Sequence, residues 1–344
     1  MADGRPMSPL EKAWHGLGRF IATRMMIIVP AGVLLGILWP ELLLPIKPYV
    51  FMLFAVMSFQ NSLPNDFKSL ARAFTQPKML VVTLLTVHVV VPLIAFVLAN
   101  LIFGAGSPTV AGVVLEYTVP IGVSTVMWIA MFGGDSALGL AALLLSTLIS
   151  PFSIPFTLQL LVGTTVEVDA LGMIKDMLIM VAIPSLAATA VNELSHGKAK
   201  REWYPRSEPL SRVLLPVIVS TNATGISETM HNLTPTLFGI MLFMFCCAVG
   251  SFVIGLGVAR VLAKDRAKFV STAFSCGMRN VSAGAVLATR YFTPEVMFPA
   301  VISTLFQQFL AAAFGRVIER LVGKREDGVP GGEGPRDEQM PSSL

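Results

Sequence analysis

The feature that most limits what this chain can fold into is a polar break inside a long apolar stretch of its C-terminal half. The segment Phe274-Ser-Cys-Gly-Met-Arg-Asn-Val-Ser282 places Arg279 and a glycine among apolar residues. A cation inside a membrane costs about 2.5 to 3.5 kcal/mol on insertion scales, so it faces protein, water or ligand rather than lipid. A matching break lies one half-chain earlier, at Thr118-Val-Pro-Ile-Gly-Val-Ser124. Two interrupted helices in corresponding halves indicate the binding site of a transporter.

Composition indicates an all-α integral membrane protein. Of the 344 residues, 54% are hydrophobic and only 13% are charged, which is more apolar surface than a soluble protein of this length needs. No small-residue cleavage site follows the first apolar run, so we interpret that run as a retained helix. Ten apolar segments of roughly membrane-spanning length follow one another, at about 22–40, 45–62, 78–103, 109–133, 136–163, 171–192, 209–226, 235–262, 267–291 and 295–321.

The charges between these segments predict the orientation of the chain. Basic residues gather in alternate loops, and acidic residues lie in the loops on the opposite side, at Glu167, Asp169, Glu228 and Glu295. Because basic loops stay on the cytoplasmic side, both termini are expected in the cytoplasm of a multi-pass plasma-membrane protein. The basic loop residues are Lys68, Arg72, Lys78, Lys198, Lys200, Arg201, Arg206, Lys264, Arg266, Lys268, Arg316, Arg320, Lys324 and Arg325.

Short matches between the two halves indicate an internal repeat. Gly122-Val-Ser124 corresponds to Asn280-Val-Ser282, and Ser146-Thr-Leu148 corresponds to Ser303-Thr-Leu305, at an offset of about 157 residues. Because each half holds an odd number of segments, the halves must have opposite orientations in the membrane. The sequence therefore predicts inverted five-helix repeats at about 21–163 and 171–322, with broken helices 4 and 9 at mid-membrane. A cytoplasmic segment, 1–20, precedes this domain, and a disordered cytoplasmic tail, 323–344, follows it.

Arg279 has two interpretations. It is either a structural partner for a carboxylate or for exposed backbone carbonyls, or a functional cation that holds an anionic substrate or replaces a bound metal ion. The neighbouring Asn280 is expected to belong to the site, because an amide needs partners and the helix break provides an opening. Each break also leaves backbone N–H groups whose partial positive charge favours an anion.

Other polar residues fall within the predicted membrane segments. Glu116 is expected either to pair with Arg279 or to carry a coupling proton, and His88 is either a satisfied core residue or a proton relay. Ser124, Thr125 and Asn222 are polar enough to line a pathway, although serine and threonine also bond to their own helix.

Enzymatic and metal-binding functions find no support. The sequence has no nucleotide-binding loop, no zinc spacing and no catalytic triad order, so we expect no enzyme and no cofactor. The cysteines, Cys246, Cys247 and Cys276, all fall in apolar segments, where buried packing is the expected role. The formal net charge of +4 follows from the loop charges and does not indicate a nucleic-acid partner.

Six motifs resemble the bile acid:sodium symporter family over residues 20–322. They are Met57-Ser-Phe-Gln-Asn-Ser-Leu63 with Asp66-Phe-Lys68, Pro92-Leu-Ile-Ala-Phe96, Pro120-Ile-Gly-Val-Ser124, Gly134-Asp-Ser-Ala-Leu138, Ser146-Thr-Leu-Ile-Ser-Pro151 and Gly277-Met-Arg-Asn280. The resemblance implies ten helices in two domains, a panel of helices 1, 2, 6 and 7 beside a core of helices 3–5 and 8–10. It also implies that helices 4 and 9 cross at their breaks, and that the substrate lies between the domains. Family substrates are mostly organic anions, including bile acids, keto acids and pantoate.

The positions that correspond to the family's sodium ligands depart from its pattern. Sodium-coupled members resemble Glu-x-Gly-Met-Gln-Asn at the second break, where this chain has Ser275 and Arg279 in place of the Glu and the Gln. The cage has thus lost a carboxylate and gained a guanidinium, so we expect no sodium coupling. By the same resemblance the remaining ligand positions are occupied by Val87, Thr125, Val126, Gly139 and Leu143.

The sequence thus predicts a secondary-active or facilitative carrier for a small organic anion, working by alternating access. One alternative is a sodium-dependent organic-anion symporter with a rearranged site. An alternative of another class is a membrane sensor on a transporter fold that does not transport. The substrate and the lipid bilayer are the expected partners, with no nucleic acid.

Overall fold

In the computed structural model, residues 8–66, 76–164, 166–232 and 234–323 are described, and their regular structure is helical apart from one isolated bridge between Ile121 and Arg279. Some predictions therefore concern residues outside the described ranges. They are those for Lys68, Arg72, Lys324 and Arg325, for residues 1–7 of the N-terminal segment, and for the tail from residue 324 onward.

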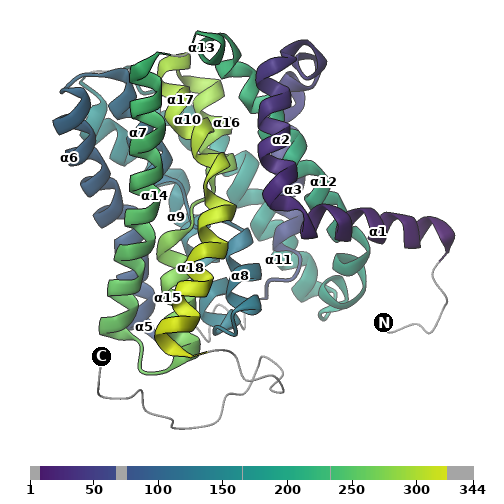
Figure 1. The fold of residues 1–344 in the computed structure, drawn as a ribbon. Coiled ribbons are helices and arrows are strands. Elements are labelled where there is room, and N and C mark those ends of the chain that lie inside the picture. Colours follow the sequence, from purple (N-terminus) through teal and green to yellow (C-terminus); the bar gives the residue numbers. More distant parts are fainter. Residues whose placement is uncertain (1–7, 67–75, 165, 233, 324–344) are drawn as a thin grey trace.

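The N-terminal half holds helices at the first five predicted segments (Figure 1). The third of these segments contains a π-helical turn, η3, and the fourth is broken between α7 and α8. The helices are α1 (Pro9–Thr23), α2 (Met25–Leu38), η1 (Pro40–Leu42), η2 (Leu44–Tyr49), α3 (Val50–Ser62), α5 (Pro77–Leu85), η3 (Thr86–Val90), α6 (Val91–Phe103), α7 (Pro108–Thr118), α8 (Ser124–Met131) and α9 (Ser136–Val162).

The C-terminal half holds helices at the other five predicted segments, and the ninth of these segments is broken. They are α10 (Ala170–Met177), η4 (Leu178–Ala182), α11 (Ile183–Leu194), η5 (Ala199–Trp203), α12 (Tyr204–Ala223), η6 (Thr224–Ile226), α13 (Ser227–His231), α14 (Pro235–Leu262), α15 (Arg266–Gly277), α16 (Val281–Tyr291), α17 (Pro294–Ile302), η7 (Ser303–Leu305) and α18 (Gln307–Val322).

Length and composition identify the helices that could each cross a membrane. Within the described residues, four continuous stretches are long and apolar enough, at Pro77–Phe103, Ser136–Val162, Ala170–Leu194 and Pro235–Leu262. Two bent pairs pass the same test together: α1 with α2, at 86°, and α17 and η7 with α18, at 44°. The other predicted segments contain shorter or more polar helices, because two of them are broken and α12 carries charged residues in its first turns.

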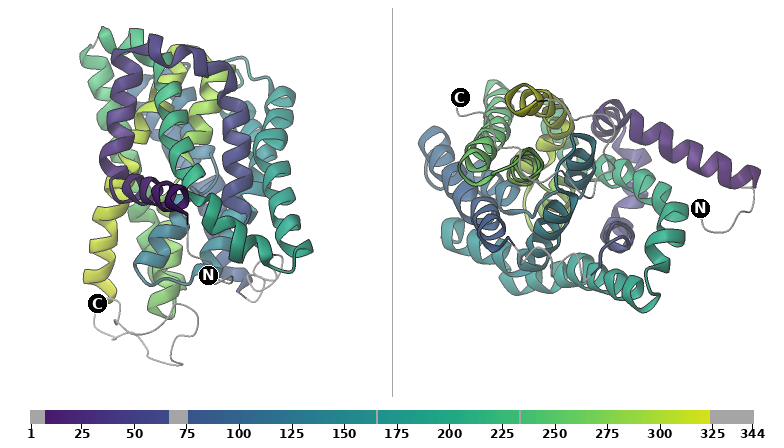
Figure 2. Two further views of the ribbon diagram at one scale, coloured as in Figure 1. Left: turned by 90° about the vertical axis from the view of Figure 1, so that its right-hand side faces the viewer. Right: turned by 90° about the horizontal axis from the view of Figure 1, so that it is seen from below.

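The helices pack in two groups that Figure 1 separates from left to right and that Figure 2 shows from two further sides. In one group α12 contacts α1, α2 and α3, and α3 contacts α11. In the other, α14 packs on α15, and α7 packs on α6, α9 and α17.

Glycines bring α2 and α12 close together. A Cβ atom at Gly32 or Gly36 would lie 2.2 Å or 2.0 Å from an oxygen of Ser220 on α12. This four-residue spacing of glycines is the pattern that lets membrane helices approach with backbones in contact.

Candidate functional site at the two helix breaks

The first break separates α7 from α8 at residues 119–123. Pro120 has no backbone N–H to continue the helix, and the chain is extended at Val119. The N–H of Ile121 donates instead to Oγ of Ser146 on α9, at 3.0 Å. A side chain thus satisfies a donor that the break would leave without a partner.

The second break separates α15 from α16 at Met278–Asn280. Asn280 is the N-terminal cap of α16, because its Oδ1 accepts from the N–H of Ala283 at 3.2 Å. Its side chain is half-buried, so a part of it stays accessible. The sequence placed both breaks correctly.

The two breaks contact each other through their backbones. The N–H of Asn280 donates to the carbonyl of Pro120 at 2.8 Å, and the N–H of Gly122 lies 3.5 Å from the carbonyl of Met278. Gly122 is needed for this approach, since a Cβ atom there would lie 2.6 Å from the carbonyl oxygen of Arg279. Residues about 157 positions apart in the sequence therefore meet inside the molecule.

The Arg279 side chain is buried, with only 2% of its surface exposed. Its Nη1 donates to the carbonyl of Cys276 at 2.9 Å and to that of Met278 at 3.4 Å. These carbonyls lie at the C-terminal end of α15, where a helix carries partial negative charge. Within the described part of the chain, Nε and Nη2 have no hydrogen-bond partner. The guanidinium therefore caps a half-helix through Nη1, while its Nε and Nη2 remain able to donate to a ligand.

Glu116 lies close enough to Arg279 for the two charges to interact, but the structure shows no ion pair between them. The carboxylate approaches the first turn of α16 instead, where a Cβ atom at Gly284 would lie 2.8 Å from Oε2. This oxygen has no hydrogen-bond partner among the described residues. A carboxylate near a helix N-terminus is electrostatically favourable, so Glu116 and Arg279 face the opposite ends of two successive half-helices.

His88 lies in a five-residue π-helical turn, η3, in the middle of the third predicted segment. Its Nε2 is 2.8 Å from Oγ of Ser146, and its Nδ1 is 3.1 Å from Oγ of Ser153. Ser146 also accepts from Ile121, so His88 supports the first break through one intervening hydroxyl. Both ring nitrogens have partners, which is the arrangement of a satisfied buried histidine.

The remaining predicted site residues differ in their surroundings. Ser124 begins α8, is half-buried, and accepts from Nε2 of Gln308 at 3.2 Å. The Thr125 hydroxyl is buried with no hydrogen-bond partner in the described chain, and so are both polar atoms of the Asn222 side chain. A buried amide without a partner costs free energy, so Asn222 at the end of α12 remains a candidate for contact with a ligand.

Apolar groups occupy several of the positions that correspond to the family's sodium ligands. The Cδ1 atom of Ile129 lies 2.4 Å from where a side chain would begin at Gly139, so an apolar group fills the space on that side. Val87 and Leu143 are buried apolar residues. The buried hydroxyls of Ser275 and Thr125 both lack a hydrogen-bond partner among the described residues.

Sequence reasoning missed two adjacent amides at the start of α18. Gln307 bonds both backbone groups of Arg279, and Gln308 bonds Ser124 and accepts from Nε1 of Trp128 at 3.0 Å. Polar residues are rare inside apolar membrane segments, so two adjacent glutamines there were a signal that the sequence already contained.

Sequence reasoning also missed a polar cluster that joins α10 to α16. Asp176 forms an ion pair with Arg290 and accepts from the Tyr291 hydroxyl at 2.5 Å. The Arg290 guanidinium also lies over the Phe51 ring, 4.6 Å from its centroid, which brings α3 into the cluster.

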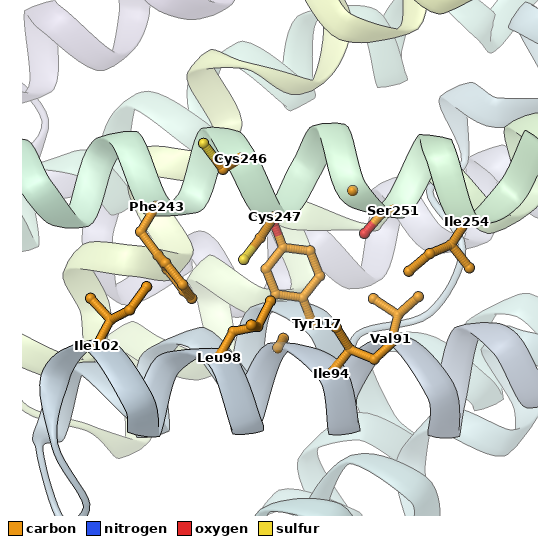
Figure 3. A pocket seen from close by; sticks show the side chains of 12 residues that line it. Val91, Ile94, Leu98, Ile102, Tyr117, Phe243, Cys246, Cys247, Ser251 and Ile254 are labelled. Carbon is orange, nitrogen blue, oxygen red and sulfur yellow. The ribbon is translucent and has the colours of Figure 1, made fainter.

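A cavity of about 220 Å³ lies between α6 and α14, away from the predicted site residues. Figure 3 shows apolar side chains from both helices pointing into it, with Tyr117 reaching it from α7. Cys246 and Cys247 also line this cavity. The sequence predicted burial for all three free cysteines; Cys276 is buried, Cys247 is half-buried and Cys246 is exposed.

A family model described as "Sodium Bile acid symporter family" matches residues 50–232, more than half of the chain. The chain belongs to this family. It is a multi-pass membrane transporter, as the motifs at residues 57–151 and 277–280 predicted.

Three relatives illustrate the range of the sodium bile acid symporter family. The uncharacterized protein YbaS of Bacillus subtilis is 32% identical over 296 residues, which are 86% of this chain and 97% of YbaS. YocS of the same organism, named an uncharacterized sodium-dependent transporter, is 24% identical over 94% of this chain and 98% of its own. BASS1 of Arabidopsis thaliana, named a probable chloroplastic sodium/metabolite cotransporter, is 25% identical over 90% of this chain and 76% of its own.

Proposed function

We propose that this transporter carries a small organic anion by alternating access, and that Arg279 supplies the positive charge that sodium supplies in sodium-coupled relatives. The observation that carries the proposal is the bond from the buried guanidinium to the carbonyl of Cys276, at the end of α15. A half-helix end at mid-membrane needs a positive charge nearby. Here the charge is covalently attached to the chain, so it does not have to be bound from solution.

Two arguments stand against a sodium ion at this place. A fixed guanidinium repels a nearby second cation more strongly in surroundings of low dielectric constant than in water. In addition, Ile129 fills the space beside Gly139, where the family resemblance calls for a hydroxyl ligand. A sodium ion would therefore displace a buried side chain and approach a like charge.

The charge distribution favours an anion. The N-termini of α8 and α16 and the Arg279 guanidinium are all sources of positive potential at the crossing. Ser124 and Asn280 are half-buried at those N-termini, and Thr125 and Asn222 hold hydroxyl and amide groups without partners. We assign these four side chains to hydrogen bonds with the substrate carboxylate and its polar substituents.

We further propose ten membrane spans, with helices 1, 2, 6 and 7 as the panel and helices 3–5 and 8–10 as the core. Support comes from the packing of α12 on α2 and α3 and of α3 on α11 on one side, and of α7 on α9 and α14 on α15 on the other. The two groups also contact each other, through α9 against α10 and η4 and through α16 and α17 against α3, α12 and η6. Rocking of the core against the panel would change these contacts. We also propose that the transporter lies in the plasma membrane, and the alternation of basic and acidic loops supports a cytoplasmic position for both termini.

A thermal-shift screen of the purified protein tests the substrate class and the absence of sodium coupling. Monocarboxylates, steroidal acids and inert controls are each added in sodium and in choline buffers of equal ionic strength. A ligand at about 100 times its Kd stabilises the folded protein by about 2.7 kcal/mol, so binding is detectable. We expect an organic anion to raise Tm equally in both buffers, and to be taken up equally by proteoliposomes.

A sodium-coupled symporter is the second candidate, and two observations favour it. YocS is named a sodium-dependent transporter and BASS1 a probable sodium/metabolite cotransporter, and Ser275 and Thr125 have buried hydroxyls without partners in the described chain. A saturable stimulation of uptake by sodium, absent with choline, would decide for this candidate and against the first.

A further inference from the structure

Helix α1 has an apolar stripe and a basic stripe along its length. Leu10, Leu17 and Phe20 are exposed, at 81%, 45% and 50% of their surfaces, and their spacing places them on one side of the helix. Lys12 and Arg19 follow the same spacing on another side and are exposed as well. An exposed helix with two such stripes is the pattern of a segment that lies at a lipid–water interface.

A third side of α1 is fixed against α12. Gly18 packs so closely that a Cβ atom there would lie 2.7 Å from Cβ of Pro209. Nε1 of Trp14 donates to the carbonyl of Arg206 at 3.1 Å, and Ile21 is buried. These contacts leave the apolar and basic stripes uncovered by the described chain, and they fix how α1 is rotated.

The direction of α1 fits a membrane surface. It meets α2 at 86°, so if α2 crosses the membrane, α1 runs nearly parallel to its plane. Figure 2 shows α1 extending sideways from the other helices. Arg206, whose carbonyl accepts from Trp14, is exposed, and so are Arg201 and Trp203 on η5, which precedes α12; Trp203 is 46% exposed. Tryptophan and basic residues gather where a protein meets the headgroups of the cytoplasmic leaflet.

We propose that α1 lies in the cytoplasmic lipid–water interface and binds an anionic phospholipid surface. Leu10, Leu17 and Phe20 enter the acyl region, while Lys12 and Arg19 contact headgroup phosphates. Through Gly18 and Trp14 the helix then ties α12 to the leaflet. The cytoplasmic side of α1 rests on the proposed topology, whereas its depth and its preference for negative charge do not.

Spin labels on the full-length chain test the depth of each stripe. Cysteines are introduced at Leu17 or at Lys12 after the native cysteines have been replaced by alanine, and the protein is placed in vesicles of phosphatidylcholine and phosphatidylglycerol. We expect the label at Leu17 to collide with oxygen and to be shielded from a water-soluble nickel chelate, and the label at Lys12 to show the reverse. Equal nickel access at both positions overturns the proposal, and spin–spin broadening at Leu17 would assign the stripe to a second copy of the chain.

Charge recognition is tested on the wild-type chain, in which no cysteine is replaced. Hydrogen exchange of the α1 amides should be several-fold slower in nanodiscs of phosphatidylglycerol than in nanodiscs of phosphatidylcholine. The double variant Lys12→Gln with Arg19→Gln should lose this difference, and Lys47→Gln, a matched exposed lysine on η2, should keep it. An unchanged exchange rate between the two lipids refutes the preference for anionic lipid, and no outcome depends on whether the protein transports an anion.

Discussion

The side-chain amide of Gln307 bonds both backbone groups of Arg279, its N–H and its carbonyl. Oε1 of Gln307 accepts from the N–H of Arg279 at 3.0 Å, and Nε2 donates to its carbonyl. On the opposite side of its backbone, Arg279 forms an isolated antiparallel bridge with Ile121. The second break is therefore bound like the middle strand of a three-stranded sheet, with a side chain as the third strand.

Replacing Gln307 by leucine should destabilise the crossing. Both backbone groups of Arg279 would lose a partner in a buried place, and each unsatisfied group costs about 1 to 3 kcal/mol. We expect a clear loss of Tm in detergent, while Gln159→Leu, at an exposed position of α9, should leave Tm nearly unchanged. Equal Tm values for the two variants would show that the Gln307 bonds do not stabilise the fold.

The sequence made the positions of both breaks predictable, because Pro120, Gly122 and Gly277 interrupt apolar runs in ways that any membrane helix must accommodate. It also drew attention to Arg279. The sequence did not show whether the partner of the Arg279 side chain is a carboxylate, a backbone carbonyl or a substrate. The choice depends on which way a buried guanidinium turns after α15 ends, and this direction is set by three-dimensional packing.

Three other features could not be predicted from the local sequence pattern. The ion pair of Asp176 with Arg290 joins residues more than a hundred positions apart, and neither lies at a motif. The filling of the space beside Gly139 by Ile129 depends on how α8 meets α9. Helix α1 extends the first predicted segment toward the N-terminus, and only the 86° bend separates it from the span.

Restoring three of the positions that correspond to the family's sodium ligands should create a response to sodium. In the triple variant Val87→Gln, Ser275→Glu and Arg279→Gln, the fixed cation is removed, a carboxylate returns to the second break, and position 87 receives the glutamine that the family resemblance implies there. We expect sodium, but not choline, to raise Tm and to stimulate uptake in this variant. The wild type serves as the matched control, because neither response is expected there. A wild type that already responds to sodium would contradict the proposed role of Arg279.

Glu116 and Arg279 should behave as separate groups rather than as an ion pair. Removing one member of a buried pair costs about 3 to 5 kcal/mol, and removing the second then restores stability. Since no ion pair is present here, Arg279→Gln should weaken substrate binding while the fold persists, and Glu116→Gln should not rescue it. A double variant that is more stable than Arg279→Gln alone would establish the pair and refute the substrate role of Arg279.

If transport is coupled to protons, Glu116 is the expected carrier. Its Oε2 has no hydrogen-bond partner in the described chain, whereas both nitrogens of His88 are occupied by Ser146 and Ser153. Under an inward proton gradient we expect wild type and His88→Ala to accumulate substrate and Glu116→Gln only to equilibrate it. Accumulation that survives in both single variants would exclude these residues, and its absence in wild type would identify a facilitator.

The cluster around Asp176 should hold one end of the transport pathway closed. It connects α10, in the proposed panel, to α16, in the proposed core, through the Asp176–Arg290 pair and the Tyr291 hydroxyl. Asp176 lies next to the acidic loop that is expected outside the cell. Asp176→Asn should therefore weaken the contact, shift the transporter toward its outward-open state and expose the pathway to the outside.

The measurement is the labelling of a cysteine at Asn222 by an external, membrane-impermeant thiol reagent, in a background without native cysteines. We expect Asp176→Asn to raise the labelling rate several-fold and the charge exchange Asp176→Arg with Arg290→Asp to restore it. Glu208→Gln is the matched control, because it breaks an ion pair with Arg212 that lies within α12 alone and does not join the two groups. Equal labelling rates in all four proteins would mean that the Asp176 cluster only stabilises the fold and that another contact closes the pathway.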